Sequence, residues 1–332
     1  MSAPTADTAD PLSRAMLAEI PPNPHARLWL ALRIVVPLAL LAYLTSVVSL
    51  PHLLAALRSI PMTSVLAVVA LLFLAMGLAA VRWRVVLHAC GIHTHVPLLE
   101  LFRLHWVGAF YNQCVPGGVG GDVVRAVATR RLYGARGLPA ALGVVLLERL
   151  LGLCGLLVLV STSFALYPLP GVPNVMLFSA IGIAAIASCI GAILAAPRIA
   201  PHLPGPLRRV LEAVPVITSL PLFGVGLLLS VLTQLMGALI GHLVVVSIAP
   251  QVTLMQSLVI NPLILAAQYV PFTVGGAGVR EFAFVTFYGL VAVPQHSSLA
   301  AALVIGAVQF LSGAAGGVVQ MLRPLEVSTT PD

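Results

Sequence analysis

The 332-residue chain is 60% hydrophobic and 8% charged, and its mean hydropathy is +1.07. A typical soluble domain carries roughly 25% charged residues, so this composition excludes a soluble protein and indicates one that spans a membrane. The formal net charge of +7 reflects 17 arginines and no lysine. This composition suits anionic lipid head groups, because guanidinium binds phosphate through paired hydrogen bonds. A biased genome composition would replace lysine by arginine equally well.

Six apolar segments reach the length of about 20 residues that crosses a bilayer core. In chain order they cover about 28–50, 62–81, 138–166, 175–196, 221–248 and 297–322. The polar residues before them do not form a signal peptide, because the first apolar run begins too late and is too long. We therefore predict an all-α polytopic membrane protein with about six spans, whose single transmembrane domain (28–323) lies between two cytoplasmic tails, 1–27 and 324–332.

Two further apolar elements, about 97–125 and 255–293, are each interrupted by the same phrase. Residues 113–125 and 268–280 both fit the pattern Q-x-V-P-x-x-V-G-G-x-x-V-R. Proline removes a helical hydrogen bond and paired glycines free the backbone, so each phrase is expected to break a helix. In membrane proteins, matched breaks in the two halves of a chain indicate a transport site.

The distribution of arginine predicts how the chain is oriented. Arginine clusters in 82–103, 125–136 and 198–209, whereas Arg58 is the one charge in 51–60, 167–174 and 249–256. Because cytoplasmic loops are rich in arginine, we place the first set and both termini in the cytoplasm, with Arg58 as an exception. The crossings then fit only if the first broken element enters and leaves on the cytoplasmic side and the second on the opposite side. This predicts two re-entrant helical elements arranged as inverted repeats. Trp83, between Arg82 and Arg84, is predicted to lie at the membrane interface.

The residues after each glycine pair begin a new helix, whose free N–H groups and partial positive charge suit an anion. Arg125 and Arg280 add a full charge at the two helix starts, beside Asp122 and Glu281. Glu148 and Arg149 lie roughly 15 Å deep in the span 138–166. A charge in the bilayer costs at least roughly 2.5–3.5 kcal/mol, so these groups are expected to pair or to line water. The candidate substrate-binding residues are Arg125, Arg280, Asp122, Glu281, Glu148, Arg149, Asn112, Gln113, Gln268, Gly120, Gly121, Gly275 and Gly276.

Structural explanations stay open for each of these features. The repeated phrase can be an architectural hinge, and Asp122 can cap the helix that follows it. Glu148 and Arg149 can form a structural ion pair, although neighbours on a helix point about 100° apart, so each is expected to reach a different helix. The side-chain amides of the two phrases can bond across helices or touch substrate.

Several other kinds of site find no support in the sequence. The four cysteines are far apart without C-x-x-C, and the nine histidines lack metal-ligand spacing, so we expect no disulfide, no metal and no other cofactor. We find no P-loop pattern, no G-x-S-x-G and no pair of catalytic carboxylates, and the glycines at 118–121 lack the βαβ context of a dinucleotide site. We therefore expect neither enzymatic activity nor a nucleic-acid partner.

Three segments, in order, resemble the lysylphosphatidylglycerol synthase transmembrane-region family of flippase-like membrane proteins. Residues 111–125 are similar to its F-N-x-x-L-P-G-G-x-G-G-D-x-x-R signature, with Tyr111 for Phe and Val115 for Leu. Residues 147–150 resemble its E-R segment, and 271–281 resemble its P-x-x-x-G-G-x-G-x-R-E segment. The resemblance implies a helical protein that moves lipids or lipid-linked head groups between leaflets. The aminoacyl-transfer domain of two-domain members is not expected here, so lysine transfer is not predicted.

Together these observations predict a flippase or translocase of the bacterial inner membrane. Its anionic or lipid-linked head group would dock between the two broken elements, and its partner would be a membrane phospholipid or an isoprenoid-linked lipid. The alternative is a non-transporting, lipid-binding scaffold for a membrane glycosyltransferase or for a hopanoid or isoprenoid-lipid pathway.

Overall fold

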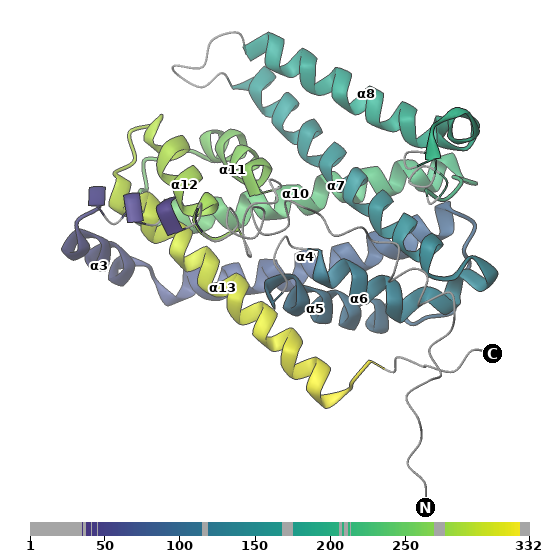
Figure 1. The fold of residues 1–332 in the computed structure, drawn as a ribbon. Coiled ribbons are helices and arrows are strands. Elements are labelled where there is room, and N and C mark those ends of the chain that lie inside the picture. The colour runs from purple at the N-terminus through teal and green to yellow at the C-terminus, as the bar shows by residue number, and fades with distance from the viewer. Residues whose placement is uncertain are drawn as a thin grey trace, which may run out of the picture.

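The computed structural model describes residues 35–325, except 36–37, 41, 45, 115–118, 168–174, 206–207, 209–211, 213 and 269–275. Every element in this part of the chain is a helix (Figure 1). Five of the described helices are long and apolar enough to cross a membrane: α4 (Met62–Ala89), α7 (Gly137–Leu166), α8 (Val175–Ile199), α10 (Leu220–Ile248) and α13 (Gln295–Leu322). They confirm five of the predicted spans, whereas the first, 28–50, is described only in part, since 28–34, 36–37, 41 and 45 lie outside the described residues.

Helix α4 is longer than the predicted span, which ended at residue 81. It continues to Ala89, and Gly91 then turns the chain with a φ of +74°. Trp83 is therefore inside the helix, and its side chain is 0% exposed. The prediction that Trp83 lies at the membrane interface was wrong, because this ring is buried among other helices of the protein.

Four shorter helices form the two broken elements. α5 (Leu98–Cys114) and α6 (Gly120–Thr129) flank the first repeated phrase, and α11 (Leu254–Gln268) and α12 (Val279–Gly289) flank the second. The residues between them, 115–118 and 269–275, belong to the part that is not described. The remaining described elements are α3 (Leu50–Ser59) and the 3-10 helices η1 (Arg130–Arg136) and η2 (Ala200–His202).

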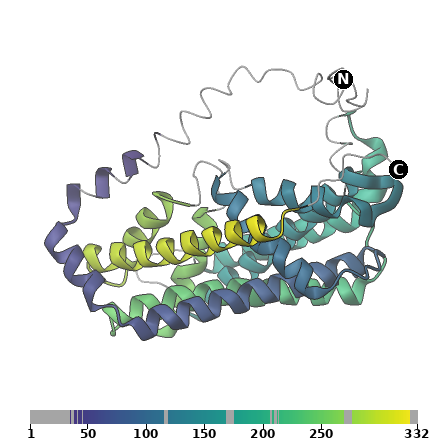
Figure 2. The ribbon, with the colours of Figure 1, turned by 90° about the horizontal axis from the view of Figure 1, so that it is seen from below.

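Two sets of four helices, α4–α7 and α10–α13, repeat the same order of long, short, short and long. The corresponding lengths are 28 and 29, 17 and 15, 10 and 11, and 30 and 28 residues. α4 and α10 pack side by side (Figure 2). They run in opposite directions, because the carbonyl of Ala89 accepts the N–H of Thr218 just before α10 (2.8 Å) and Val86 faces Gly226. The two halves are thus inverted, as the arginine distribution predicted.

The first hairpin, α5 with α6, opens at the end of the bundle where α4 ends. There Arg84 of α4 donates to the carbonyl oxygen of Val96, just before α5 (2.6 Å). The hairpin returns through η1 to the same end, since Tyr133 of η1 and Pro139 of α7 line a cavity together with Cys90 at the end of α4.

The second hairpin, α11 with α12, opens at the other end. A hydrophobic cluster there joins Val65, near the start of α4, to Val252 before α11 and Val293 after α12. The predicted arrangement of two re-entrant hairpins that open at opposite ends is confirmed. Both hairpins therefore point inward, toward the middle of the long helices.

Glycines allow the first hairpin to pack closely on both sides. A Cβ on Gly121 of α6 would lie 2.6 Å from the carbonyl carbon of Gly108 in α5, so these helices touch through their backbones. On the other side of α5, a Cβ on Gly317 of α13 would lie 2.9 Å from the ring of Phe110. Small residues of this kind let helices approach closely in membranes, and here they fix α5 between α6 and α13.

Candidate functional site

Arg125 of α6 is the centre of a buried ion cluster in the first half of the chain. Its side chain donates from Nη1 to Oε2 of Glu148 in α7 (3.0 Å) and from Nη2 to Oδ1 of Asp122 one turn earlier (2.9 Å). Nη1 also donates to Nε2 of His105 in α5 (3.1 Å), and the guanidinium lies 4.9 Å from the centre of the Trp83 ring in α4. Four helices therefore hold one guanidinium, which is 8% exposed.

His105 binds Arg125 as a neutral imidazole. Its Nδ1 lies 3.1 Å from the carbonyl oxygen of Leu101. A carbonyl can only accept, so Nδ1 carries the proton and Nε2 offers its lone pair to Arg125. The ring also packs edge-on against Trp83, with 5.3 Å between the centroids. α5 and α4 thus hold the guanidinium without adding charge.

Glu148 and Arg149 connect α7 to the first half through different partners. Glu148 is 1% exposed and forms ion pairs with Arg125 and, at 3.6 Å, with Arg82 of α4. Arg149 is more exposed, and its Nε bonds to Oδ2 of Asp122. Both neighbours therefore bond to α6, Glu148 through Arg125 and Arg149 through Asp122, so the prediction that each reaches a different helix was wrong.

Asp122 does not cap its helix. The N-cap of α6 is Val119, which makes no side-chain cap, and the Asp122 carboxylate bridges Arg125 and Arg149 instead. Gly120 and Gly121 are the buried first residues of α6, and the N–H of Gly121 is accepted by Oδ1 of Asn112 in α5 (2.8 Å). Asn112 thus stabilises the start of α6 from the neighbouring helix.

A second, smaller buried cluster lies at the start of α12. Arg280 donates from Nε to Oε1 of Glu281 (3.0 Å) and from Nη1 to Oε1 of Gln309 in α13 (2.8 Å). The other oxygen of Glu281, Oε2, accepts the N–H of Gly278 (2.6 Å) and so caps α12. Both charged residues are at least nine-tenths buried.

The other predicted residues of the second phrase have local roles. Gln268 donates to the carbonyl oxygen of Ile264 in its own helix (3.3 Å). Gly276 has a φ of +79°, a left-handed backbone conformation that favours glycine. Gly275 lies outside the described residues.

The two hairpins meet at Gln309 of α13. Its side chain accepts from Arg280 of the second hairpin, and its backbone oxygen accepts from Nε2 of Gln113 at the end of α5 (2.6 Å). The sequence prediction did not include Gln309, although an isolated amide in an apolar span is a signal that could have found it. It also missed Arg82, because this arginine was assigned to the end of its span.

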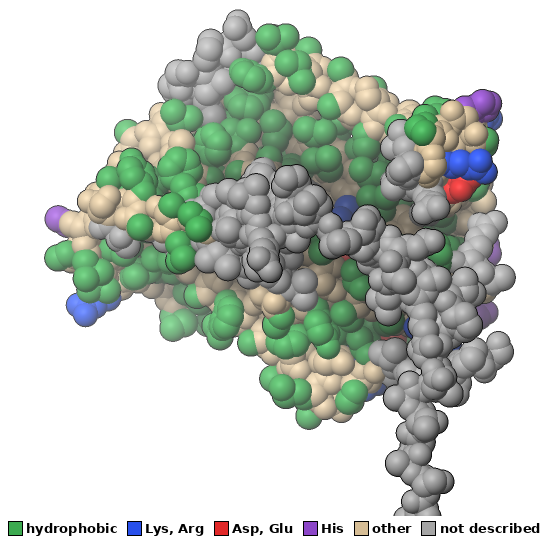
Figure 3. Space-filling view, viewed as in Figure 1, with side chains coloured by type: hydrophobic (Ala, Val, Ile, Leu, Met, Phe, Trp, Pro, Cys, Tyr) green, Lys and Arg blue, Asp and Glu red, His purple; other side chains and the backbone are tan. Residues whose placement is uncertain are grey.

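These clusters lie within an apolar exterior. Figure 3 shows a face made mostly of hydrophobic side chains, with basic atoms visible near its middle and at its edges. Large hydrophobic side chains are exposed on the long helices, among them Phe73, Phe178 and Phe310. Such an exterior suits contact with lipid chains.

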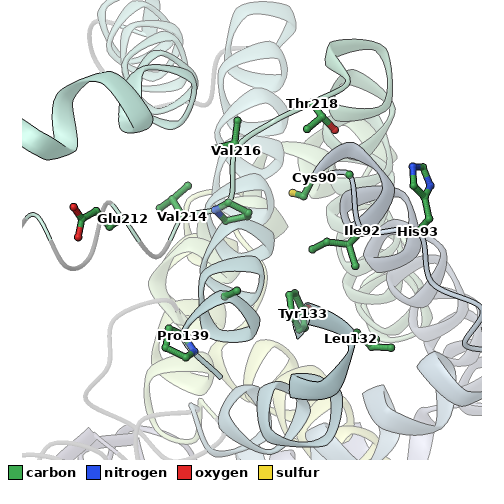
Figure 4. A pocket seen from close by; sticks show the side chains of 13 residues that line it. Cys90, Ile92, His93, Leu132, Tyr133, Pro139, Glu212, Val214, Val216 and Thr218 are labelled. Atoms are coloured by element: carbon green, nitrogen blue, oxygen red, sulfur yellow. The ribbon is translucent and has the colours of Figure 1, made fainter. Parts of the chain in front are cut away.

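A cavity of about 980 Å³ lies where α4 ends and α7 and α10 begin (Figure 4). Its lining residues include Cys90, His93, Tyr133, Glu212 and Thr218. Burial raises the pKa of the Cys90 thiol to about 12, so this thiol stays protonated. The described part of the lining has a carboxylate and no arginine, which does not match an anionic ligand. Among the described residues, no three His, Cys, Asp or Glu side chains are grouped as metal ligands.

Comparison with known proteins agrees with the geometry. The model of the family described as the lysylphosphatidylglycerol synthase TM region matches residues 28–317, a range that contains both hairpins and both buried clusters. No curated protein matches the chain significantly. The chain is thus a membrane protein with a lipid-related function, and it belongs to the lysylphosphatidylglycerol synthase transmembrane-region family.

Proposed function

We propose that the protein is a lipid translocase that moves an anionic or lipid-linked head group between the leaflets of the bacterial inner membrane. The observation that carries this proposal is the meeting of the two hairpins at Gln309. Because the hairpins open at opposite ends of the long helices, a head group held between them could be released to either side. Transport sites of this kind lie between inverted repeats near the middle of the membrane.

The buried charges support an anionic head group. Burying a charged side chain in a bilayer costs free energy, so such residues usually mark a functional site. The first cluster contains three guanidinium groups, those of Arg82, Arg125 and Arg149, and two carboxylates. Guanidinium is the side chain that best matches phosphate oxygens in pairs. The head group would exchange with the carboxylates while its tails stay in the bilayer, and no chemical step is needed.

The arginine distribution supports an orientation. The end of the bundle where the first hairpin opens carries Arg84, Arg103 and the charged residues of η1, so we place it in the cytoplasm together with both termini. The second hairpin would then open toward the outer side.

Labelled lipid in proteoliposomes tests the proposal. Liposomes that contain the protein and fluorescent phosphatidylglycerol are treated with dithionite, which destroys the label it can reach. Translocation predicts loss of the inner-leaflet label, and label loss equal to that of protein-free liposomes would overturn the proposal. Gln309→Leu should slow exchange, because it leaves a donor of Arg280 buried without its acceptor. The matched control is Gln320→Leu on the same helix, since the Gln320 amide oxygen is buried without a hydrogen-bond partner.

The scaffold alternative predicts a different pair of results. A non-transporting, lipid-binding protein would leave exchange unchanged and would copurify with a membrane glycosyltransferase or with an enzyme of a hopanoid or isoprenoid-lipid pathway. Gentle purification from native membranes, followed by mass spectrometry, separates the two proposals.

A further inference from the structure

Arg82 is a buried guanidinium whose donors are poorly used. It lies in α4, a helix long enough to cross the membrane, and its side chain is 12% exposed. Its Nε is buried and has no hydrogen-bond partner. Nη2 faces Glu148 at 3.6 Å, beyond hydrogen-bond distance, and Nη1 makes one long bond to the hydroxyl of Ser230 (3.4 Å).

The unused donors of Arg82 lie on one edge of the guanidinium. Nε–H and the neighbouring Nη2–H point the same way and form the edge that binds two oxygens of one anion. Arg280 and Arg103 use this same edge for the carboxylates of Glu281 and Glu100. The Nε of Arg84 is also buried without a partner, but its Nη2 donates to the carbonyl oxygen of Val96. Of these four arginines, Arg82 is the one in which neither donor of this edge makes a hydrogen bond. Buried polar groups are almost always bonded, so an unused edge calls for an explanation.

The charge of the surrounding cluster favours an anion at this edge. Among the described contacts of the first cluster, three guanidinium groups face two carboxylates, and His105 adds no charge. The second cluster has one arginine and one carboxylate, which balance. At the positions that the two phrases share, Ala277 replaces Asp122. The two halves repeat in backbone but not in charge.

We propose that the Nε/Nη2 edge of Arg82 binds two oxygens of a phosphate group, and that Arg82 is the anion-recognition residue of the site. Arg125 and Arg280 then hold the hairpins, since both already bond to protein partners. The phosphate would replace Oε1 of Glu148, which is itself buried without a hydrogen bond, while Oε2 stays on Arg125. This inference rests on the proposed function, and it narrows the head group to a phosphate ester.

Titration calorimetry on the full chain in an uncharged detergent tests this proposal. The ligands are dioctanoyl phosphatidylglycerol, the fatty acid octanoate, and inorganic phosphate. We expect saturable binding of the phosphate lipid and weaker binding of octanoate. Arg82→Gln should weaken phosphate-lipid binding by about ten- to a hundredfold, the usual worth of charge-assisted hydrogen bonds. Arg84→Gln removes one positive charge from the same helix outside the cluster, and it should leave the affinity unchanged.

Two further variants separate recognition from a structural role. Arg82→Lys keeps the charge but loses the two-pronged edge, so it should fold like the wild type and bind with an intermediate loss. If Arg82 served only to balance Glu148, the double variant Arg82→Gln/Glu148→Gln would restore binding, and this result would overturn the proposal. So would the absence of binding by the wild type, or equal affinity of wild type and Arg82→Gln.

The ligand series also identifies the source of the phosphate and keeps the two proposals apart. If binding depends on Arg82 and the phosphate lipid binds more tightly than inorganic phosphate, the ligand is a lipid head group. If inorganic phosphate binds as tightly as the lipid, the same edge of Arg82 binds a free anion. Arg82-dependent binding without exchange in proteoliposomes would overturn translocation and leave the site in place. Exchange together with Arg82-independent binding would overturn this inference alone.

Discussion

Gly121→Ala should force α6 away from α5. The added Cβ would lie 2.6 Å from the carbonyl carbon of Gly108 and 2.8 Å from its Cα, whereas ordinary contacts begin at 3.4 Å. The obstructing atoms, which include the carbonyl oxygen of Gly108, are backbone, so no side chain can turn aside and the two helices must separate. Overpacking of this kind costs about 1–3 kcal/mol of folding free energy.

Thermal unfolding in detergent measures the effect of this substitution. The matched control is Gly77→Ala in α4, where an added Cβ meets nothing within 4 Å and alanine favours the helix. We expect a lower melting temperature for Gly121→Ala and an equal or higher one for Gly77→Ala. Asp122 and Arg125 follow Gly121 on α6, so lipid exchange should fall as well. A Gly121→Ala protein as stable and as active as the wild type would refute the close contact of α5 with α6.

The remaining predictions concern three other side chains. Glu148→Ala should lower the free energy of unfolding by about 3–5 kcal/mol, because Arg125 keeps its buried charge and loses a carboxylate, and Glu148→Gln should cost less. A hydrogen bond from Arg103 holds the pKa of Glu100 below its usual range. The ionised Glu100 carboxylate therefore stabilises the fold fully above the unfolded pKa of about 4.3, and this stabilisation is lost as the pH falls through the lower, folded pKa. We expect Glu100→Gln to destabilise the protein more at pH 7 than at pH 3. The Cys90 thiol, with a pKa of about 12, should react with iodoacetamide at pH 8 far more slowly in the folded than in the unfolded chain.

Each of these predictions has a clear contrary result. Equal melting temperatures for wild type and Glu148→Ala would show that the Arg125 charge is not buried as described. A stability difference for Glu100→Gln that stays constant between pH 7 and pH 3 would contradict an effect that depends on ionisation. Fast labelling of Cys90 in the folded chain would contradict its protonated, half-buried state.

The sequence predicted the helices and their inverted arrangement well, because those features follow from local rules. Apolar length indicates a span, and proline with paired glycine indicates a break. The ends of α7, α10 and α13 lie within two residues of the predicted limits. The prediction for α4 ended too early, because Arg82 and Arg84 were taken as the end of a span. Both lie inside the helix, where Arg82 pairs with Glu148 of α7 and Arg84 donates to the carbonyl oxygen of Val96.

The partners inside the site could not be predicted in the same way. Arg125 and Asp122 were expected to lie together, since they are one helical turn apart. Their contacts with Glu148, His105 and Trp83 depend on how four helices pack, and no sequence spacing encodes that. Sequence also predicted two equivalent arginines. The structure instead surrounds the Arg125 side chain with four partners, Asp122, Glu148, His105 and Trp83, and that of Arg280 with two, Glu281 and Gln309.

Side-specific labelling tests whether the two hairpins open on opposite sides of the membrane. In a cysteine-free chain, one cysteine is placed at His93, exposed near the opening of the first hairpin, and another, in a separate protein, at Gln251, exposed near the opening of the second. Each protein is treated with a membrane-impermeant maleimide in right-side-out and inside-out vesicles. We expect labelling of His93→Cys in inside-out vesicles only and of Gln251→Cys in right-side-out vesicles only. Labelling of both positions from the same side would contradict it.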